Sequence, residues 1–164
     1  MTSGNDAVAD ALKANAADLL RYLQRRVGEE APDVLGETML VAWRRARDMP
    51  TDATQARMWL FGIARMAAIG HGRDASRRLR LAERLHGLVE PVVWPDDDIA
   101  IDVRQAIASL PEGQAELVRL VHWEGFSLAD AAQVMGLNAS TARGRYQKAR
   151  EELTRLLAVT VERD

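Results

Sequence analysis

Apolar residues recur along almost the whole chain at spacings of three and four residues, which is the period of an amphipathic α-helix. The first such stripe comprises Val8, Leu12, Ala16, Leu19, Leu20 and Leu23. The second comprises Val34, Leu35, Thr38, Ala42 and Ala46, and the third comprises Ala56, Trp59, Leu60, Ile63 and Ala67. A turn at residues 48–52 separates the last two. The first half of the chain is therefore predicted to be a small helical bundle.

The third predicted helix contains three interior glycines, Gly62, Gly70 and Gly72. Each is expected to cost about 1 kcal/mol relative to alanine, because glycine has more backbone freedom to lose. We therefore expect the second half of this helix to be bent or frayed.

Helical periodicity stops after residue 84 and resumes near residue 101. The intervening segment contains Pro91 and Pro95 and the run Asp96, Asp97 and Asp98, which is typical of a connection between domains. The predicted fold is thus all-α, with two small helical domains at residues 5–84 and 101–160 joined by an acidic linker at 85–100.

The second domain has the local signals of a helix-turn-helix. Pro111 suits the first turn of a helix, and residues 127–130 have the form of a capping box that starts a short helix ending at Met135. Gly136 can adopt a left-handed conformation, and Asn138 or Ser140 can cap the final helix.

The final helix shows two distinct faces. Its predicted buried stripe is Ala142, Tyr146, Ala149, Leu153 and Leu156. A separate face carries Arg143, Gly144, Gln147 and Arg150 near the N-terminal end, which is the end that enters the major groove in helix-turn-helix proteins. Arginine can bind a guanine edge and glutamine an adenine edge, whereas Arg145, Lys148 and Arg150 suit phosphates. The alternative is an exposed, charged C-terminal helix of an ordinary bundle.

Composition narrows the possible functions. The chain has 164 residues, 48% of them hydrophobic, no cysteine and a net charge of -2, which favours a globular protein of a reducing compartment such as the cytoplasm. We expect no membrane segment. Basic residues gather in 57–84 and 143–150, on either side of the acidic linker. This distribution suggests selective rather than indiscriminate nucleic-acid binding.

Motifs for catalysis are lacking. The chain has no P-loop, nucleophile elbow or paired catalytic carboxylates, so no enzymatic activity is expected. Residues 70–75 match G-x-G-x-x-A, but a helical context argues against dinucleotide binding. His71, His86 and His122 lack partners at ligand spacing, so neither a metal nor another cofactor is predicted.

Both halves also carry longer motifs in a fixed order. In the second half these are Leu110-Pro111-Glu112, residues 124–132 and residues 140–145, and together they resemble the fourth conserved region of extracytoplasmic-function (ECF) sigma factors of bacterial RNA polymerase. In the first half, residues 21–23, 33–43 and 56–65 resemble region two of the same family. The resemblance covers about residues 15–157.

The resemblance implies partners and roles. Residues 33–47 would dock on the clamp helices of the polymerase's largest subunit, through Asp33, Val34, Glu37, Thr38, Val41, Arg44 and Arg45. The loop at 48–57 would receive a flipped promoter base, and the next helix would hold the melted strand. Candidates for these downstream contacts are Arg57, Trp59, Arg65, His71, Arg73, Arg77 and Arg78. For Trp59 we favour a position in the core, because it is in step with Leu60 and Ile63.

The upstream promoter element would be bound by region four. Its candidate contacts are Ser140, Thr141, Arg143, Gly144, Arg145, Gln147, Lys148 and Arg150. The family also implies contact with the flap of the polymerase's second-largest subunit and control by an anti-sigma factor.

Four positions depart from residues common in the family. Met66 and Gly70 stand where Asn and Asp are frequent, Gly144 replaces a small polar residue and Gly36 replaces Gln. We therefore expect weak or narrowly specific promoter melting. Two other functions stay open: a helix-turn-helix regulator that acts without being a polymerase subunit, and a sequestering or adaptor protein that has lost melting.

Overall fold

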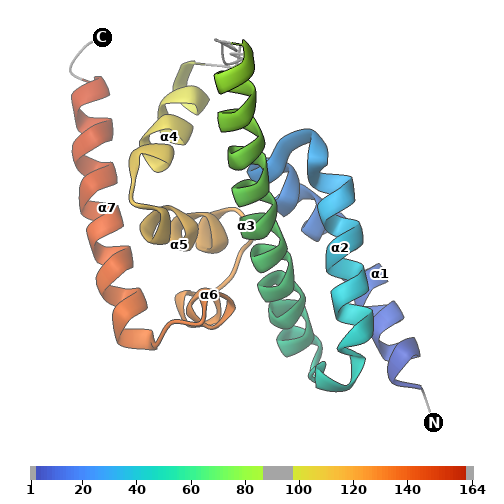
Figure 1. Ribbon diagram of the computed structural model, residues 1–164. Helices are drawn as coiled ribbons and strands as arrows, with labels where there is room; N and C mark the ends of the chain where they lie inside the picture. The colour runs from blue at the N-terminus through green and yellow to red at the C-terminus, as the bar shows by residue number, and fades with distance from the viewer. Residues whose placement is uncertain (1–2, 87–97, 162–164) are drawn as a thin grey trace. The chain divides into compact units, whose positions relative to one another are not determined.

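The computed structural model describes residues 3–86 and 98–161, and within these ranges the chain forms α-helices and short 3-10 turns without any β-strand (Figure 1). This confirms the expected all-α fold. The chain divides into two compact units, Met1–Glu90 and Pro91–Asp164. Each unit is described on its own below.

The first unit is built from α1 (Gly4–Val27), α2 (Ala31–Arg44) and α3 (Ala53–His86), and each of these helices contacts the other two. Leu19 and Leu23 of α1, Val34 of α2, and Leu60 and Phe61 of α3 are all 0% exposed. Because all three helices contribute fully buried side chains, a single hydrophobic core fixes how α2 and α3 present their remaining faces.

Short local signals set the ends of these helices. Ser3 and Asp6 form a capping box at the start of α1, and Pro32 occupies the first turn of α2, where its missing N–H costs no hydrogen bond. The 3-10 turns Gly28–Glu30 and Ala46–Asp48 flank α2 on its two sides.

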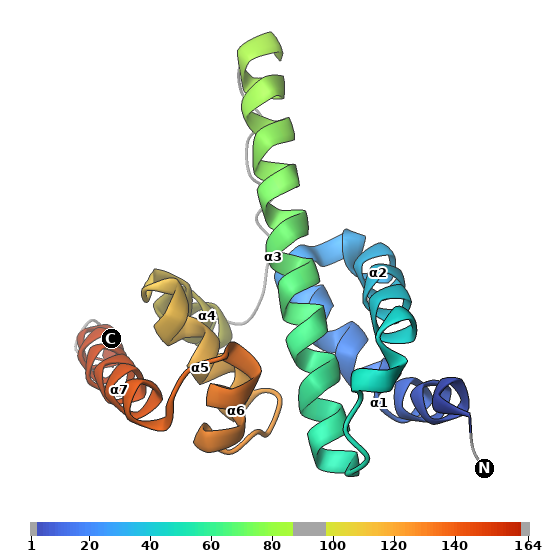
Figure 2. The same cartoon turned by 60° about the horizontal axis from the view of Figure 1, so that its bottom comes forward.

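The third helix does not break at its glycines. It runs as one α-helix of 34 residues, and its C-terminal half extends beyond α1 and α2 (Figure 2). The interruption expected at Gly62, Gly70 and Gly72 is therefore not seen. A glycine lowers helix stability through backbone entropy but keeps its N–H and C=O, so the hydrogen-bond ladder can continue through it.

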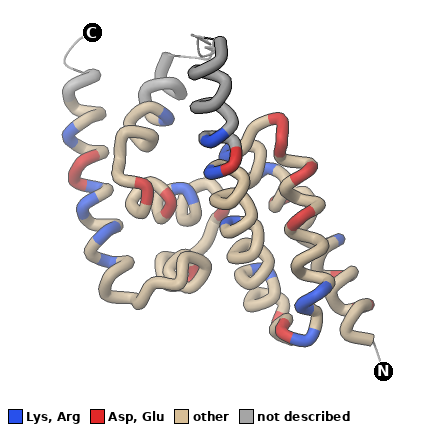
Figure 3. The backbone as a smooth tube through the Cα atoms, in the orientation of Figure 1, with Lys and Arg blue, Asp and Glu red and all other residues tan. Residues whose placement is uncertain are grey.

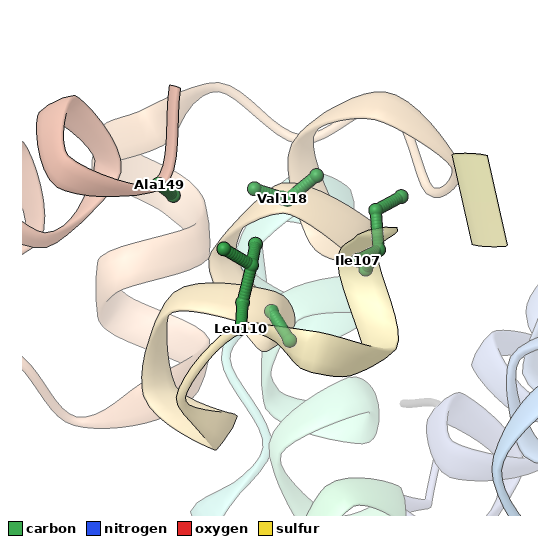
Figure 4. Packing of buried hydrophobic residues seen from close by; sticks show 5 residues of the cluster. Ile107, Leu110, Val118 and Ala149 are labelled. Atoms are coloured by element: carbon green, nitrogen blue, oxygen red, sulfur yellow. The ribbon is translucent and has the colours of Figure 1, made fainter. Parts of the chain in front are cut away.

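The second unit contains α4 (Asp98–Ser109), α5 (Glu112–His122), α6 (Leu128–Met135) and α7 (Ala139–Val161). The buried cluster of this unit comprises Ile107 of α4, Leu110 directly after α4, Ala115 and Val118 of α5, and Ala149 of α7 (Figure 4). The half-buried side chains of Trp123, Tyr146 and Leu153 pack around this cluster. The cluster thus attaches one side of α7 to α4 and α5.

The structure shows one half of the capping box predicted for the second unit, and Pro111 is the N-cap of α5, directly before its first turn. The Ser127 hydroxyl accepts a hydrogen bond of 3.1 Å from the Asp130 amide at the start of α6. Gly136 ends α6 with φ 68° and ψ 28°, the left-handed conformation for which glycine is suited. Of the two residues proposed to cap the last helix, Asn138 does so, because its Oδ1 accepts from the Thr141 amide at 2.8 Å.

Helices extend into both ends of the predicted linker, since α3 ends at His86 and α4 begins at Asp98. Residues 87–97 of that linker lie outside the described residues. Among the helices that the structure describes, none combines the length and the apolar character needed to span a bilayer.

Candidate functional site

The outward face of α7 lies opposite its buried side. Ala142 and Ala149 are 0% exposed, and at 3.6 residues per turn Ser140, Gly144 and Gln147 fall on the opposite side of the helix. All three are exposed, and helix geometry puts the exposed Arg143 and Lys148 at their flanks. Lys and Arg recur along α7 (Figure 3). The outward face of α7 therefore combines hydrogen-bonding and basic groups at the start of a helix whose other side is fixed in a core.

The remaining upstream candidates lie away from the centre of the outward face of α7. Arg145 lies beside α5, so close that a Cβ built on Gly113 would stand 3.0 Å from its Nη1. Thr141 is half-buried, and Arg150 is exposed beside the buried side. Gln147 donates a 3.2 Å hydrogen bond to Glu151 on the next turn, so binding a base would require this contact to be exchanged.

Gly144 stands at the centre of the outward face of α7. A Cβ built there would meet no heavy atom of the rest of the chain within 4 Å, and its backbone is not in the left-handed region. Neither crowding nor backbone conformation thus demands glycine, which costs about 1 kcal/mol relative to alanine inside a helix.

A second contact holds α7 from behind. Tyr146 Oη and His122 Nε2 are 2.7 Å apart, and their rings stack with centroids separated by 6.0 Å. Together with the buried cluster, this contact fixes α7 against α5 and so sets the direction in which the outward face of α7 points.

The outward face of α2 is apolar. Met39 is 40% exposed, Leu40 57% and Trp43 47%, although each is a large hydrophobic side chain. Gly36 precedes Leu40 by one helical turn on the same side, and a Cβ there would also meet nothing within 4 Å. Sequence reasoning missed these three hydrophobic residues, although their position away from the stripe of Val34, Thr38 and Ala42 was a usable signal.

The residues predicted to bind polymerase are distributed differently over α2. Asp33, Glu37 and Arg44 are exposed, and Val41 is half-buried. Val34 and Thr38 are both 0% exposed, and Thr38 donates a hydrogen bond of 2.8 Å to the Val34 carbonyl. The prediction that these two side chains touch a partner is wrong, because they belong to the core between the helices.

Arg45 also turns away from the outward face of α2. Its Nε lies 3.2 Å from Asp48 Oδ2, and its guanidinium is 5.9 Å from the centre of the Trp59 ring. It therefore joins the end of α2 to the start of α3. The core position favoured for Trp59 is wrong as well, because its side chain is only half-buried beside this arginine.

The outward face of α3 brings together some of the downstream candidates. Four residues of α3 lie on this side because they are spaced by seven or four residues, close to whole helical turns: Trp59, Met66, Arg73 and Arg77. Met66 is 62% exposed. The two arginines are exposed. This face thus offers a partly exposed aromatic ring, an exposed apolar side chain and two cations along one line.

Arg57 faces the inside of the first unit instead. Its Nη1 donates to Asn15 Oδ1 at 3.0 Å and to Asp18 Oδ2 at 2.9 Å, and its guanidinium lies 4.7 Å from the Phe61 ring centre. Nη1 of Arg57 therefore holds α1 against α3, and the strand contact proposed for Arg57 stays a prediction.

The remaining downstream candidates do not gather at one place. Arg65 is half-buried, with its Nε inaccessible to solvent, and His71 is half-buried on another side of α3. Arg78 lies in α3, but its side chain is outside the described residues. Fewer of the downstream candidates therefore share one face of α3 than the sequence predicted.

Two titratable groups of α7 have shifted pKa values. Among the described residues, no three His, Cys, Asp or Glu side chains are grouped so as to hold a metal ion. The hydrogen bond from Arg155 lowers the pKa of the exposed Glu152 carboxyl, and the same hydrogen bond raises the pKa of Arg155. Both groups lie at the surface of α7, where such a pair is an ordinary helix contact.

Residues 100–153 match the family described as "Sigma-70, region 4". The match spans most of α4, all of α5 and α6, and α7 as far as Leu153. It therefore contains the buried cluster and the outward face of α7.

Characterised relatives align with most of both units. The ECF RNA polymerase sigma factor SigM of Mycobacterium tuberculosis is 33% identical over 144 residues, which cover 84% of this chain and 69% of the relative. The ECF RNA polymerase sigma factor SigL of the same species is 30% identical over 141 residues, covering 82% and 80%.

Solved structures share the fold. The sigma factor RpoE of Bartonella quintana, in complex with the anti-sigma factor NepR, superposes with a TM-score of 0.65 at 24% identity, covering 90% of this chain and 97% of that one. CnrH, in complex with the cytosolic domain of CnrY, superposes with a TM-score of 0.62 at 23% identity, covering 96% and 99%.

Proposed function

This chain belongs to the ECF RNA polymerase sigma factors, and from that premise we propose that it binds core RNA polymerase and directs transcription from promoters whose upstream element is bound by α7. The observation that carries the proposal is the outward face of α7. Its exposed Ser140, Arg143 and Gln147 follow the turn made by Gly136 and the cap made by Asn138. This is the arrangement that places a recognition helix in a major groove.

The proposed polymerase contact is the outward face of α2. Met39, Leu40 and Trp43 are exposed side by side, and burying such side chains against a protein surface supplies much of the affinity of an interface. Exposed Asp33, Glu37 and Arg44 would form the polar rim around them. The partner is the pair of clamp helices of the largest subunit, and the second unit would contact the flap of the second-largest subunit.

The proposed surface for melted DNA is the outward face of α3. Trp59 offers a ring for stacking, and Arg73 and Arg77 offer cations for the phosphates of a single strand. Met66 is apolar and exposed, and it cannot donate the hydrogen bonds that an asparagine there could make to a base. We infer that melting is weak or restricted to few promoters.

Regulation by an anti-sigma factor follows from the same surfaces. The relatives of known structure are bound to NepR and to the cytosolic domain of CnrY. A partner that covers Leu40 and Trp43 would remove exposed apolar area from water and would block polymerase at the same time. The protein would act as a non-catalytic subunit in the cytoplasm, where the polymerase is.

Reconstitution with purified core polymerase on a library of genomic promoter fragments tests the proposal. We expect a stable complex with core polymerase and start sites that share one upstream element. A chain that binds its DNA site equally well without polymerase would be a helix-turn-helix regulator instead. A chain that joins the polymerase but opens no fluorescent promoter bubble would be the adaptor that has lost melting.

A further inference from the structure

Gly144 has no explanation inside the chain, although it occupies the centre of the outward face of α7. No heavy atom of the rest of the chain would lie within 4 Å of an added Cβ, and the backbone there is helical. Alanine would therefore fit without strain and would favour the helix. Glycine at this position leaves the outward side of the helix without a side chain.

The neighbours of this gap limit what can fill it. Arg143 and Gln147 lie beside it, and Ser140 lies one turn before it; all three are exposed and carry hydrogen-bond donors. These groups suit the acceptor atoms of base edges, whereas the bare Cα of Gly144 offers neither a donor nor an acceptor side chain. In the major groove the protruding group without hydrogen-bonding capacity is the C5-methyl of thymine.

We propose that Gly144 is a specificity-determining notch that receives the C5-methyl group of one thymine in the upstream promoter element, while Arg143 and Gln147 bind the adjacent base edges. This inference rests on the proposed function, because it needs α7 in the major groove. It assigns a base preference to a residue that makes no hydrogen bond through a side chain.

The notch has a consequence that can be measured with single methyl groups. In Gly144→Ala the new methyl group would occupy the space of the thymine methyl, and the two cannot be accommodated at the helix–base distance that the wild-type chain allows. Replacing that thymine by deoxyuridine removes the second methyl without changing base pairing. The effects of adding the protein methyl and of removing the DNA methyl on the binding free energy should therefore not be additive, as a double-mutant cycle can show.

The experiment uses the full chain in complex with core polymerase, on the promoter recovered by the wild-type complex. Each thymine of the upstream element is replaced by deoxyuridine in turn, and the dissociation constant is measured for the wild-type chain and for Gly144→Ala. We expect Gly144→Ala to bind the thymine promoter about tenfold more weakly, which corresponds to one good base contact. We also expect deoxyuridine at one position to restore most of that loss while weakening the wild type.

Gly72→Ala is the matched control. Gly72 is also an exposed glycine inside a helix with nothing within 4 Å, but it lies in α3 of the other unit. Gly72→Ala should raise the melting temperature, and its affinity should change equally little for the thymine and the deoxyuridine promoters. Gly144→Ala should also melt no lower than wild type.

Two results would overturn the inference. One is a Gly144→Ala chain that binds as tightly as wild type, or that loses affinity equally on every deoxyuridine promoter. The other is a lower melting temperature for Gly144→Ala, which would mean that the glycine serves the fold. A wild-type chain that selects no promoter with core polymerase would instead refute the proposed function, and the two failures are thus distinguishable.

Discussion

The outward faces of α2 and α7 differ in chemistry although both lie on amphipathic helices with a well-buried reverse side. The face of α2 exposes Leu40 and Trp43, whereas the face of α7 exposes Arg143, Gln147 and Lys148. Burial of apolar area gains free energy from displaced water and does not weaken as salt rises, whereas phosphate binding releases counterions and weakens as salt rises. The comparison indicates that one face suits a protein partner and the other a polyanion.

The largest expected effect is on the α2 side. Trp43→Ala should weaken the complex with core polymerase by about 2 to 4 kcal/mol, or roughly 30- to 1,000-fold, because a large aromatic side chain at the centre of an interface is a typical hot spot. Folding should be unaffected, since Trp43 is 47% exposed in the free chain. Fluorescence anisotropy of the labelled chain titrated with core polymerase measures the change.

Met66→Ala serves as the control for this variant. Met66 is 62% exposed, so the substitution also removes exposed apolar area, but from the face of α3 proposed for melted DNA. Without DNA it should leave the affinity for core polymerase close to wild type. If Trp43→Ala bound as well as Met66→Ala, the outward face of α2 would not be the polymerase contact.

On the α7 side, Arg143→Ala should cost about 1 to 3 kcal/mol in binding to the preferred promoter, because a bidentate contact to a guanine is lost. Affinity for core polymerase should not change. Arg155→Ala removes the same charge about 18 Å further along the helix, at 1.5 Å per residue, and should have little effect on promoter choice. Equal promoter profiles for the two variants in a selection experiment would contradict a base-reading role for Arg143.

Different contacts also fix the helices that carry the two faces. Arg57→Ala tests the contribution of one such contact to the stability of the first unit. Arg57→Ala removes the hydrogen bonds to Asn15 and Asp18 and should lower the free energy of unfolding of the first unit by about 1 to 2 kcal/mol. For a unit of this size that is a fall in melting temperature of about 5 to 10 °C. Calorimetry of the full chain measures it.

A double-mutant cycle shows whether this effect comes from the contact. Asp18→Asn should reproduce part of the loss, and the two substitutions together should cost less than their sum. Below its melting temperature, Arg57→Ala should open promoter DNA as wild type does. Normal stability combined with failed opening would instead support Arg57 as a strand contact.

The smallest expected effect concerns the salt dependence of promoter binding by the outward face of α7. Lys148→Ala should weaken promoter binding by only a few-fold, uniformly across sequences, and should reduce the slope of log K against log salt by about 1. Lys13→Ala makes the same charge change at an exposed position of α1 and should leave the slope unaltered. The affinity for core polymerase, measured over the same salt range, should vary much less in all three chains.

Features that depend on neighbours in the sequence were predictable. The buried positions Ala142 and Ala149, the left-handed Gly136 and the cap by Asn138 all follow from periodicity and turn chemistry within a few residues. These signals were sufficient for the all-α fold and for the face that α7 presents. The region-four match covers the same segment.

Features that depend on tertiary packing were not predictable in this way. Helix α3 is covered by both α1 and α2, so its buried arc is wide and reaches Met58 and Phe61, whereas Trp59 stays half-exposed although it is in step with Leu60. The partner of Arg57 lies 39 residues away, in Asp18, and no local pattern connects them. Hydrophobic periodicity identifies a buried direction but not how many neighbours cover it.

The His122–Tyr146 contact has a practical consequence for following the two units in one molecule. The chain contains only two tyrosines, of which Tyr146 is in the second unit and Tyr22 lies against Phe61 in the first. Fluorotyrosine incorporated throughout the intact chain would therefore give one ¹⁹F resonance for each unit. The two signals would report separately on which unit responds when polymerase, promoter DNA or an inhibitor is added.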